Sequence, residues 1–162
     1  MVENYLYFTE LAGMPVLDLK HRRIGRVRDA AIVPVVDSSR IDRVLVGGGD
    51  SWLTIRYDQI QSIALGKGIA LSDEQLTPYH EDEFMLRIGR DLLDQQIIDV
   101  TGRKVVRVND LTFEIRNDGE RDTLVVPSWR EMVLEAETDL VLFGYSDRTA
   151  QEKLGLFRER RG

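Results

Sequence analysis

The feature that most constrains the fold is an internal repeat with an offset of 81 residues. Residues 16–30 align without a gap on residues 97–111, which read IIDVTGRKVVRVNDL. Unrelated stretches match at roughly one position in fifteen, and here the identical pairs are Asp18/Asp99, Arg22/Arg103, Arg26/Arg107, Val27/Val108 and Asp29/Asp110. The same offset continues beyond this stretch, for example in Leu11/Leu92. The chain is therefore an internal duplication whose period is a small domain.

Each copy of the repeat has the pattern of a β-hairpin. An apolar pair leads into an aspartate and a polar turn, and a basic pair then opens a second apolar run. Aspartates beside turns commonly bond to turn amides, so this is the role we expect for Asp18, Asp29, Asp99 and Asp110. The alternative is a pair of acid or metal sites. The arginines of the motif (Arg22, Arg26, Arg103 and Arg107) are expected to form surface ion pairs with these carboxylates, each worth little.

Further strands are expected along both halves of the chain. In the first half they cover residues 41–46, 52–57 and 63–71, and the Gly47-Gly48-Gly49 run is interpreted as a hairpin loop, because no phosphate-loop spacing follows it. In the second half they cover residues 105–114, 123–126, 129–137 and 139–143, with Asn117-Asp118-Gly119 as a turn. Val27 and Val108 are expected in equivalent core positions. The predicted organisation is a first unit over 1–71, an acidic linker over 72–83 and a second unit over 84–162.

The acidic linker offers a second set of candidates for a metal site. It holds five acids and no Lys or Arg, and Glu81, Asp82 and Glu83 are adjacent. Carboxylates with water suit Mg²⁺, but a solvated linker explains the same composition. We therefore expect no resident cofactor, and little or no effect of Mg²⁺ on stability.

Composition argues against several functional classes. The chain has 162 residues, a net charge of −6, no cysteine and two histidines, His21 and His80. Thiolate sites are thus excluded, a zinc site is improbable, and a nucleic-acid partner is not expected from an acidic chain with mixed charges. A nucleophile with a base and a positioned partner is also missing, so the sequence predicts a protein that is not an enzyme. No apolar run is long enough to cross a bilayer, and the start lacks the basic region of a signal peptide, which favours a cytoplasmic location.

The last segment has the pattern of a short helix. Ser146-Asp147 can cap it, and its apolar positions are Ala150, Leu154 and Phe157. We expect a homodimer, with this stripe as the dimer or partner surface.

The repeat motif resembles the PRC-barrel family. The similarity is carried by GMPVLDLKHRRIGRVRDAAIV and LLDQQIIDVTGRKVVRVNDL, and it is greatest for the cytosolic tandem units of bacterial MgtE-type magnesium transporters. This resemblance implies an all-β fold of two tandem small antiparallel β-barrels, followed here by the short C-terminal helix. It also implies a non-catalytic regulatory or docking module that binds a protein partner or downstream transporter domains. The alternative is a RimM-like ribosome maturation factor, against which stand the −6 charge and the absence of that family's glycine-rich opening.

Overall fold

The computed structural model describes residues 4–47, 51–93, 96–99, 104–107 and 110–126, and for 96–99 and 104–107 it describes the backbone. The predicted strands at 129–137 and 139–143 lie outside these residues. So do Val108 and the predicted helix with Ala150, Leu154 and Phe157.

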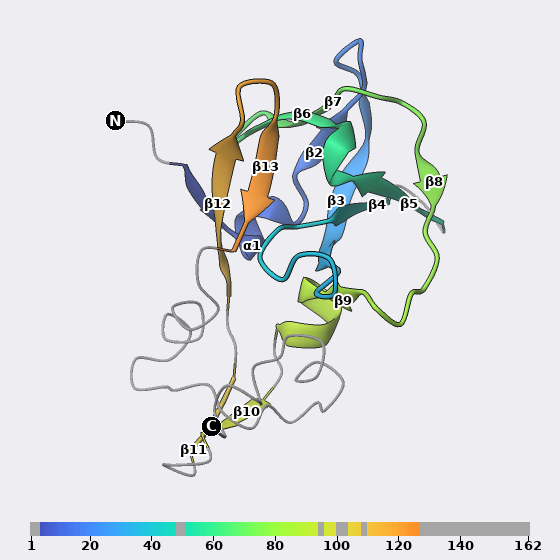
Figure 1. Cartoon of the computed structure of the whole chain (residues 1–162). Helices are drawn as coiled ribbons and strands as arrows, with labels where there is room; N and C mark the ends of the chain where they lie inside the picture. The colour runs from blue at the N-terminus through green and yellow to red at the C-terminus, as the bar shows by residue number, and fades with distance from the viewer. Residues whose placement is uncertain (1–3, 48–50, 94–95, 100–103, 108–109, 127–162) are drawn as a thin grey trace.

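An eight-stranded sheet is built from the first half of the chain, the connection after it and one strand of the second half, β9 (Figure 1). Its strands follow the order β6-β7-β2-β3-β4-β5-β8, and β9 pairs with β3. The bounds are β2 Pro15–Leu17, β3 Arg23–Ile32, β4 Arg43–Gly47, β5 Trp52–Arg56, β6 Ile60–Ala64, β7 Gly68–Leu71, β8 Thr77–Pro78 and β9 Leu86–Arg87. All neighbouring pairs are antiparallel except β2 with β7.

The second half contributes two smaller sheets. Strands β12 (Thr112–Asn117) and β13 (Asp122–Val125) form a hairpin, and β1 (Tyr5–Tyr7) pairs with β12 to complete a three-stranded sheet. Strands β10 (Gln96–Asp99) and β11 (Lys104–Arg107) form a separate pair. The strand expected over 105–114 is therefore divided between β11 and β12.

The expectation of a mostly β fold is confirmed, whereas the expected pair of closed barrels is not seen. The path of the large sheet has two ends, β6 and β8, and the three-stranded sheet is open as well. Among the described residues, the end strands of the three-stranded sheet are β1 and β13. The division into units over 1–71 and 84–162 stays a prediction.

The two repeat hairpins do form, with equivalent pairings. In the first, Val16 is opposite Gly25, and in the second, Ile97 is opposite Val106, which is the same pair displaced by 81 residues. The first hairpin is closed by a turn at Leu19 and Lys20, in which the His21 N–H bonds the Asp18 carbonyl, and His21 has a φ of 62°. The hairpin prediction is thus confirmed in both copies.

Short helices connect the strands and position the polar groups discussed below. They are α1 (Phe8–Leu11), η1 (Tyr57–Gln59) and η2 (Ile88–Leu92), of which η2 is a single π-helical turn. No helix in the described part of the chain has the length and apolar character needed to cross a bilayer.

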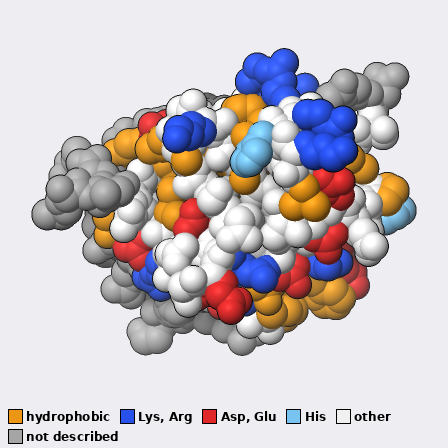
Figure 2. Space-filling view, turned by 90° about the horizontal axis from the view of Figure 1, so that it is seen from above, with side chains coloured by type: hydrophobic (Ala, Val, Ile, Leu, Met, Phe, Trp, Pro, Cys, Tyr) orange, Lys and Arg blue, Asp and Glu red, His pale blue; other side chains and the backbone are white. Residues whose placement is uncertain are grey.

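One hydrophobic core is shared by both halves. It includes Leu11 and Val27 from the first half and Leu111 and Phe113 from the second. The rings of Phe8 and Phe113 lie 6.3 Å apart between centroids. Val27 is buried as expected. On the face shown in Figure 2, by contrast, acidic, basic and apolar side chains are intermixed, as the composition indicates.

Candidate functional site

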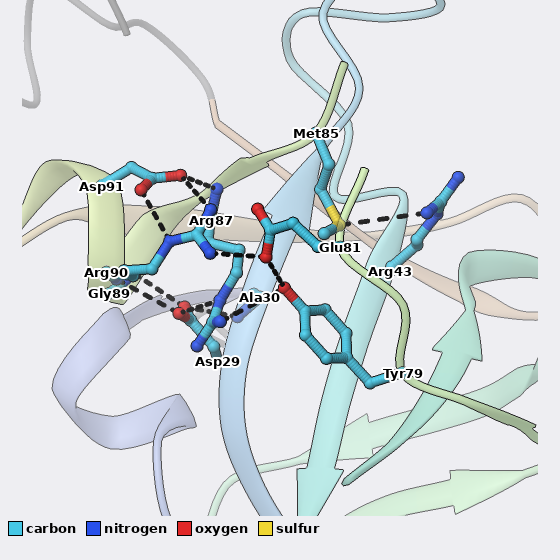
Figure 3. Close-up of polar contacts among 10 residues, drawn as sticks. All are labelled: Asp29, Ala30, Arg43, Tyr79, Glu81, Met85, Arg87, Gly89, Arg90 and Asp91. Atoms are coloured by element: carbon cyan, nitrogen blue, oxygen red, sulfur yellow. Dashed lines mark hydrogen bonds and ion pairs between the residues drawn. The ribbon is translucent and has the colours of Figure 1, made fainter. Parts of the chain in front are cut away.

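A buried carboxylate on β3, that of Asp29, is the centre of the most connected polar cluster in the described residues (Figure 3). Its Oδ1 accepts hydrogen bonds from the backbone N–H groups of Ala30 at 2.8 Å and Gly89 at 2.7 Å. Its Oδ2 accepts from Arg87 Nε at 3.0 Å and from the Arg90 N–H at 3.2 Å. Asp29 is 2% exposed, so this carboxylate exchanges its water shell for four protein donors.

Glycine at position 89 permits this close approach. A Cβ there would lie 3.0 Å from Asp29 Oδ1 and 3.1 Å from the ring of Phe8. The backbone of η2 can therefore come close enough for its first N–H groups to meet the carboxylate.

A second layer of side chains surrounds Arg87. Its guanidinium lies 5.0 Å from the ring centre of Trp52 and 5.3 Å from that of Tyr79, which are cation–π distances. Tyr79 donates its hydroxyl proton to Glu81 at 2.6 Å, and Arg90 pairs with the same Glu81 oxygen at 2.7 Å. Figure 3 shows Arg87 of β9, Arg90 of η2, and Tyr79 and Glu81 of the segment after β8 lying around Asp29 of β3.

The cluster keeps fixed charges at neutral pH. Hydrogen bonds from Arg90 and then Tyr79 lower the pKa of Glu81 to about 2. Asp91 and then Glu81 raise the pKa of the Arg90 guanidinium. Burial, and then the bond to Glu81, raise the pKa of the Tyr79 phenol. Because none of these shifts moves a pKa toward 7, they favour a role in positioning over proton transfer.

Two surface pockets differ in charge. One, of about 390 Å³, is lined by Glu10, Ala12, Gly13, Met14, Pro15, Leu65, Gly66 and Lys67. Its one cation is Lys67, and the carboxylate of Glu10 already accepts the Tyr7 N–H at 2.8 Å. The other, of about 300 Å³, is lined by Asp18, Ile24, Leu53, Leu71, Glu74 and Leu76. The charged side chains that line the first pocket are thus one anion and one cation, whereas those that line the second, Asp18 and Glu74, are both acidic.

The repeat-motif residues have several different roles. Asp18 bonds the N–H groups of Lys20 and Arg22 and pairs with Arg22 Nε at 3.0 Å, and the bond from the Arg22 N–H is the main cause of its lowered pKa. Arg26, by contrast, donates to the Gly13 carbonyl. Asp110 bonds the Leu111 N–H and both the N–H and the hydroxyl of Thr9. The side chains of Asp99, Arg103 and Arg107 lie outside the described residues.

The three adjacent acids of the linker have separate partners. Glu81 is held by Tyr79 and Arg90, while Asp82 accepts the Phe84 N–H and pairs with Arg43 at 3.6 Å. Glu83 is exposed. Within the described ranges, no three His, Cys, Asp or Glu side chains are grouped as a metal would require.

Several residues of the cluster were not identified from the sequence. Arg87, Arg90 and Tyr79 belong to no motif. Lys67, which lines the first pocket and not this cluster, lies between two glycines and belongs to no motif either. A signal for part of the cluster was present, because Asp29 and Asp110 are a repeat pair and both bond a short helix of the opposite half.

Comparison with known proteins points to a different relationship from the one that the repeat motif implied. Gentisate 1,2 dioxygenase 1 of Aquipseudomonas alcaligenes is 47% identical over 62 residues, which cover 38% of this chain and 17% of that protein. Gentisate 1,2-dioxygenase of a Streptomyces species is 48% identical over 61 residues, covering 38% and 16%. The chain thus spans about a sixth of the length of these curated relatives. No protein-family model matches the chain.

These matches correct the sequence-based assignment. Four expectations are wrong, because the similarity found is to a dioxygenase. They are the PRC-barrel resemblance, the regulatory or docking function beside a magnesium transporter, the RimM-like alternative and the expectation of a non-enzyme. The physical reason is that the repeat motif is a general hairpin signal. Asp18 accepts hydrogen bonds from the N–H groups of its own turn, and aspartates have this role in turns of unrelated β proteins.

Proposed function

We propose that the chain is a dioxygenase-related protein that recognises a hydroxylated aromatic acid of the gentisate type. The observation that supports this is the 47% identity over 62 residues to a gentisate 1,2-dioxygenase. Since the matched stretch is 17% of that relative, the proposal concerns the class of ligand and the place where it binds.

The described residues do not fit a catalytic iron site. Non-haem iron oxygenases typically hold the metal with two histidines and one carboxylate. Here the two histidines lie on different loops, His21 between β2 and β3 and His80 after β8, and no group of three ligands is found in the described ranges. We therefore assign this part of the chain to ligand recognition and not to iron-dependent catalysis.

The pocket beside Lys67 suits such a ligand. Gentisate is a benzene ring with one carboxylate and two hydroxyls, and the apolar walls formed by Met14, Pro15 and Leu65 can hold a ring. Lys67 can neutralise the carboxylate. The volume of about 390 Å³ is within the range of small-molecule sites.

Calorimetric titration of the full chain with gentisate tests the proposal. We expect saturable binding, and weaker binding of hydroquinone, which lacks the carboxylate. Loss of one charged hydrogen bond in Lys67→Gln should weaken gentisate binding roughly tenfold or more, while Lys20→Gln, in the β2–β3 turn, should leave it unchanged. No saturable binding, or equal binding by both lysine variants, would refute the proposed site. Oxygen uptake with gentisate and Fe²⁺, measured in parallel, would extend the role to catalysis.

A further inference from the structure

The two halves of the chain hold each other through exchanged segments. The first segment, β1 with α1, leaves its own half, so that β1 pairs with β12 and the Phe8 N–H bonds the Leu111 carbonyl at 2.8 Å. The second segment, β9 with η2, makes the reverse exchange, and β9 pairs with β3. Each segment therefore completes a sheet of the other half.

The polar contacts of the two segments correspond as well. Asp110 accepts the N–H of Leu111 and the N–H of Thr9 in α1. Asp29, its repeat partner, accepts the N–H of Ala30 and the N–H of Gly89 in η2. Each aspartate thus accepts the N–H of the next residue in its own half and an N–H from the first turn of the helix of the opposite half.

A one-residue difference in offset is absorbed inside the helices. Equivalent hydrogen bonds run from the Tyr7 N–H to Glu10 at α1 and from the Arg87 N–H to Asp91 at η2. The two donors are 80 residues apart and the two acceptors 81, so the second segment has one additional residue. The closing bonds run from the Ala12 N–H to the Phe8 carbonyl and from the Leu93 N–H to the Ile88 carbonyl. The π turn of η2 contains the additional residue. The helix of each half can therefore make equivalent hydrogen bonds with the aspartate of the other half.

We propose that this interface is self-complementary and that its second occupant is another copy of the chain. In such a dimer the first half of one chain contacts the second half of its partner, and the contacts repeat about a two-fold axis. The hinge is the connection over residues 72–85, which contributes to the first sheet only the two-residue strand β8. Glu10 of α1 also lines the pocket beside Lys67, but the pairing of the two halves rests on β1, β9 and the two aspartates, so the proposal does not depend on the proposed function.

Concentration decides between the two arrangements. Outside the hinge, the closed monomer and the exchanged dimer contain the same contacts between the halves. The effective concentration of one half near the other therefore sets the balance, and for short connections this is on the order of millimolar. The monomer is therefore favoured at micromolar protein. During refolding, a tenfold rise in free monomer concentration should raise the dimer-to-monomer ratio about tenfold.

Single-cysteine variants of the full chain test the exchange, because the chain has no native cysteine. Tyr5 and Glu114 are opposite each other in the β1–β12 pair, which joins the two halves. Tyr5→Cys and Glu114→Cys, each with a different tag, are unfolded, mixed, refolded at high concentration and oxidised. We expect a disulfide-linked heterodimer carrying both tags on a non-reducing gel.

Two controls make the result decisive. Arg43 and Arg56 are opposite each other in β4–β5 within one half, so a mixture of Arg43→Cys and Arg56→Cys should give background crosslinking alone. The double variant Tyr5→Cys/Glu114→Cys should crosslink within one chain. If the double variant crosslinks and the mixed pair stays at background, exchange between copies is refuted. If the double variant fails to crosslink, the β1–β12 contact on which the inference rests is refuted.

Discussion

At the scale of single residues, the buried carboxylate of Asp29 has the largest expected effect on stability. Its four donors come from β3, β9 and η2, and its ion pair with Arg87 joins side chains that are 2% and 12% exposed. Asp29→Asn removes the charge and leaves Arg87 buried without it, which should lower the free energy of unfolding by about 3 kcal/mol. Urea denaturation monitored by circular dichroism measures this change.

Asp58→Asn is the matched control for that substitution. Asp58 also pairs with an arginine, Arg56, at 3.2 Å, but the two side chains are 49% and 54% exposed. Exposed pairs contribute at most about 1 kcal/mol. Equal loss of stability in the two variants would contradict the assignment of Asp29 to a buried structural role.

Glu81 should make stability depend on pH in the acid range. Its pKa is about 2 in the folded protein and near 4.5 when unfolded, so the unfolded chain binds the proton first as pH falls. The contribution of Glu81 is fully present above pH about 4.5 and is lost as pH falls toward 2. Since its side chain is 58% exposed, the contribution is at most about 1 kcal/mol.

Glu81→Gln should therefore lose less stability than the parent protein between pH 5 and 2. Urea midpoints at several pH values in this interval measure the difference. Parallel pH profiles for the two proteins would show that the Arg90 and Tyr79 contacts do not hold the carboxylate in its ionised form.

At the scale of elements, the turn between β6 and β7 depends on Gly68. Its φ is +126°, and a Cβ there would lie 2.4 Å from the carbonyl oxygen of Pro15, at the point where β7 runs parallel to β2. Gly68→Ala combines backbone strain with a clash against main chain and should cost more than about 2 kcal/mol.

Gly66→Ala is the control, in the same turn. Gly66 also has a positive φ, +83°, but a Cβ there would meet nothing within 4 Å. It should cost about 1 kcal/mol, from the backbone alone. Thermal unfolding of both variants measures the two values, and a Gly66 effect as large as that of Gly68 would argue against the close approach to Pro15.

The elements also show what the sequence could predict. Alternation, turn residues and the repeat identified both hairpins, the β12–β13 turn and the strand at β5, because these depend on neighbours in the chain. The exchange of β1 and β9 was not predictable in this way. A three-residue and a two-residue strand carry little periodicity, and their partners lie far away in the sequence. The same holds for the Arg87 and Arg90 contacts, which exist because η2 docks on the opposite half.

At the scale of the whole molecule, the shared core predicts a single unfolding transition. Phe113 is fully buried in the second half and contacts the first half through Phe8. Phe113→Ala should cost about 3–5 kcal/mol through lost burial and a cavity, and it should destabilise both halves together.

Two probes test this cooperativity. In a Trp129→Phe background, Trp52 fluorescence reports on β5 in the large sheet, while far-ultraviolet circular dichroism reports on all strands. The two urea curves should coincide before and after Phe113→Ala. Val36→Ala, at a side chain that is 66% exposed, should change stability by no more than about 0.5 kcal/mol. Separate transitions would show that the halves unfold independently.

The pairing of β1 with β12 has a consequence for how the chain is made. Tyr7 is opposite Thr112, so β1 meets its partner only after about a hundred further residues have left the ribosome. At about 5–20 residues per second, this delay is on the order of 5–20 seconds. Until residues 88–92 are made, the Asp29 site also lacks its η2 donors, because these residues follow every strand of the large sheet in the order of synthesis. The nascent first half therefore presents unsatisfied edges that close when the second half emerges, and translation speed across residues 72–112 sets how long they are exposed.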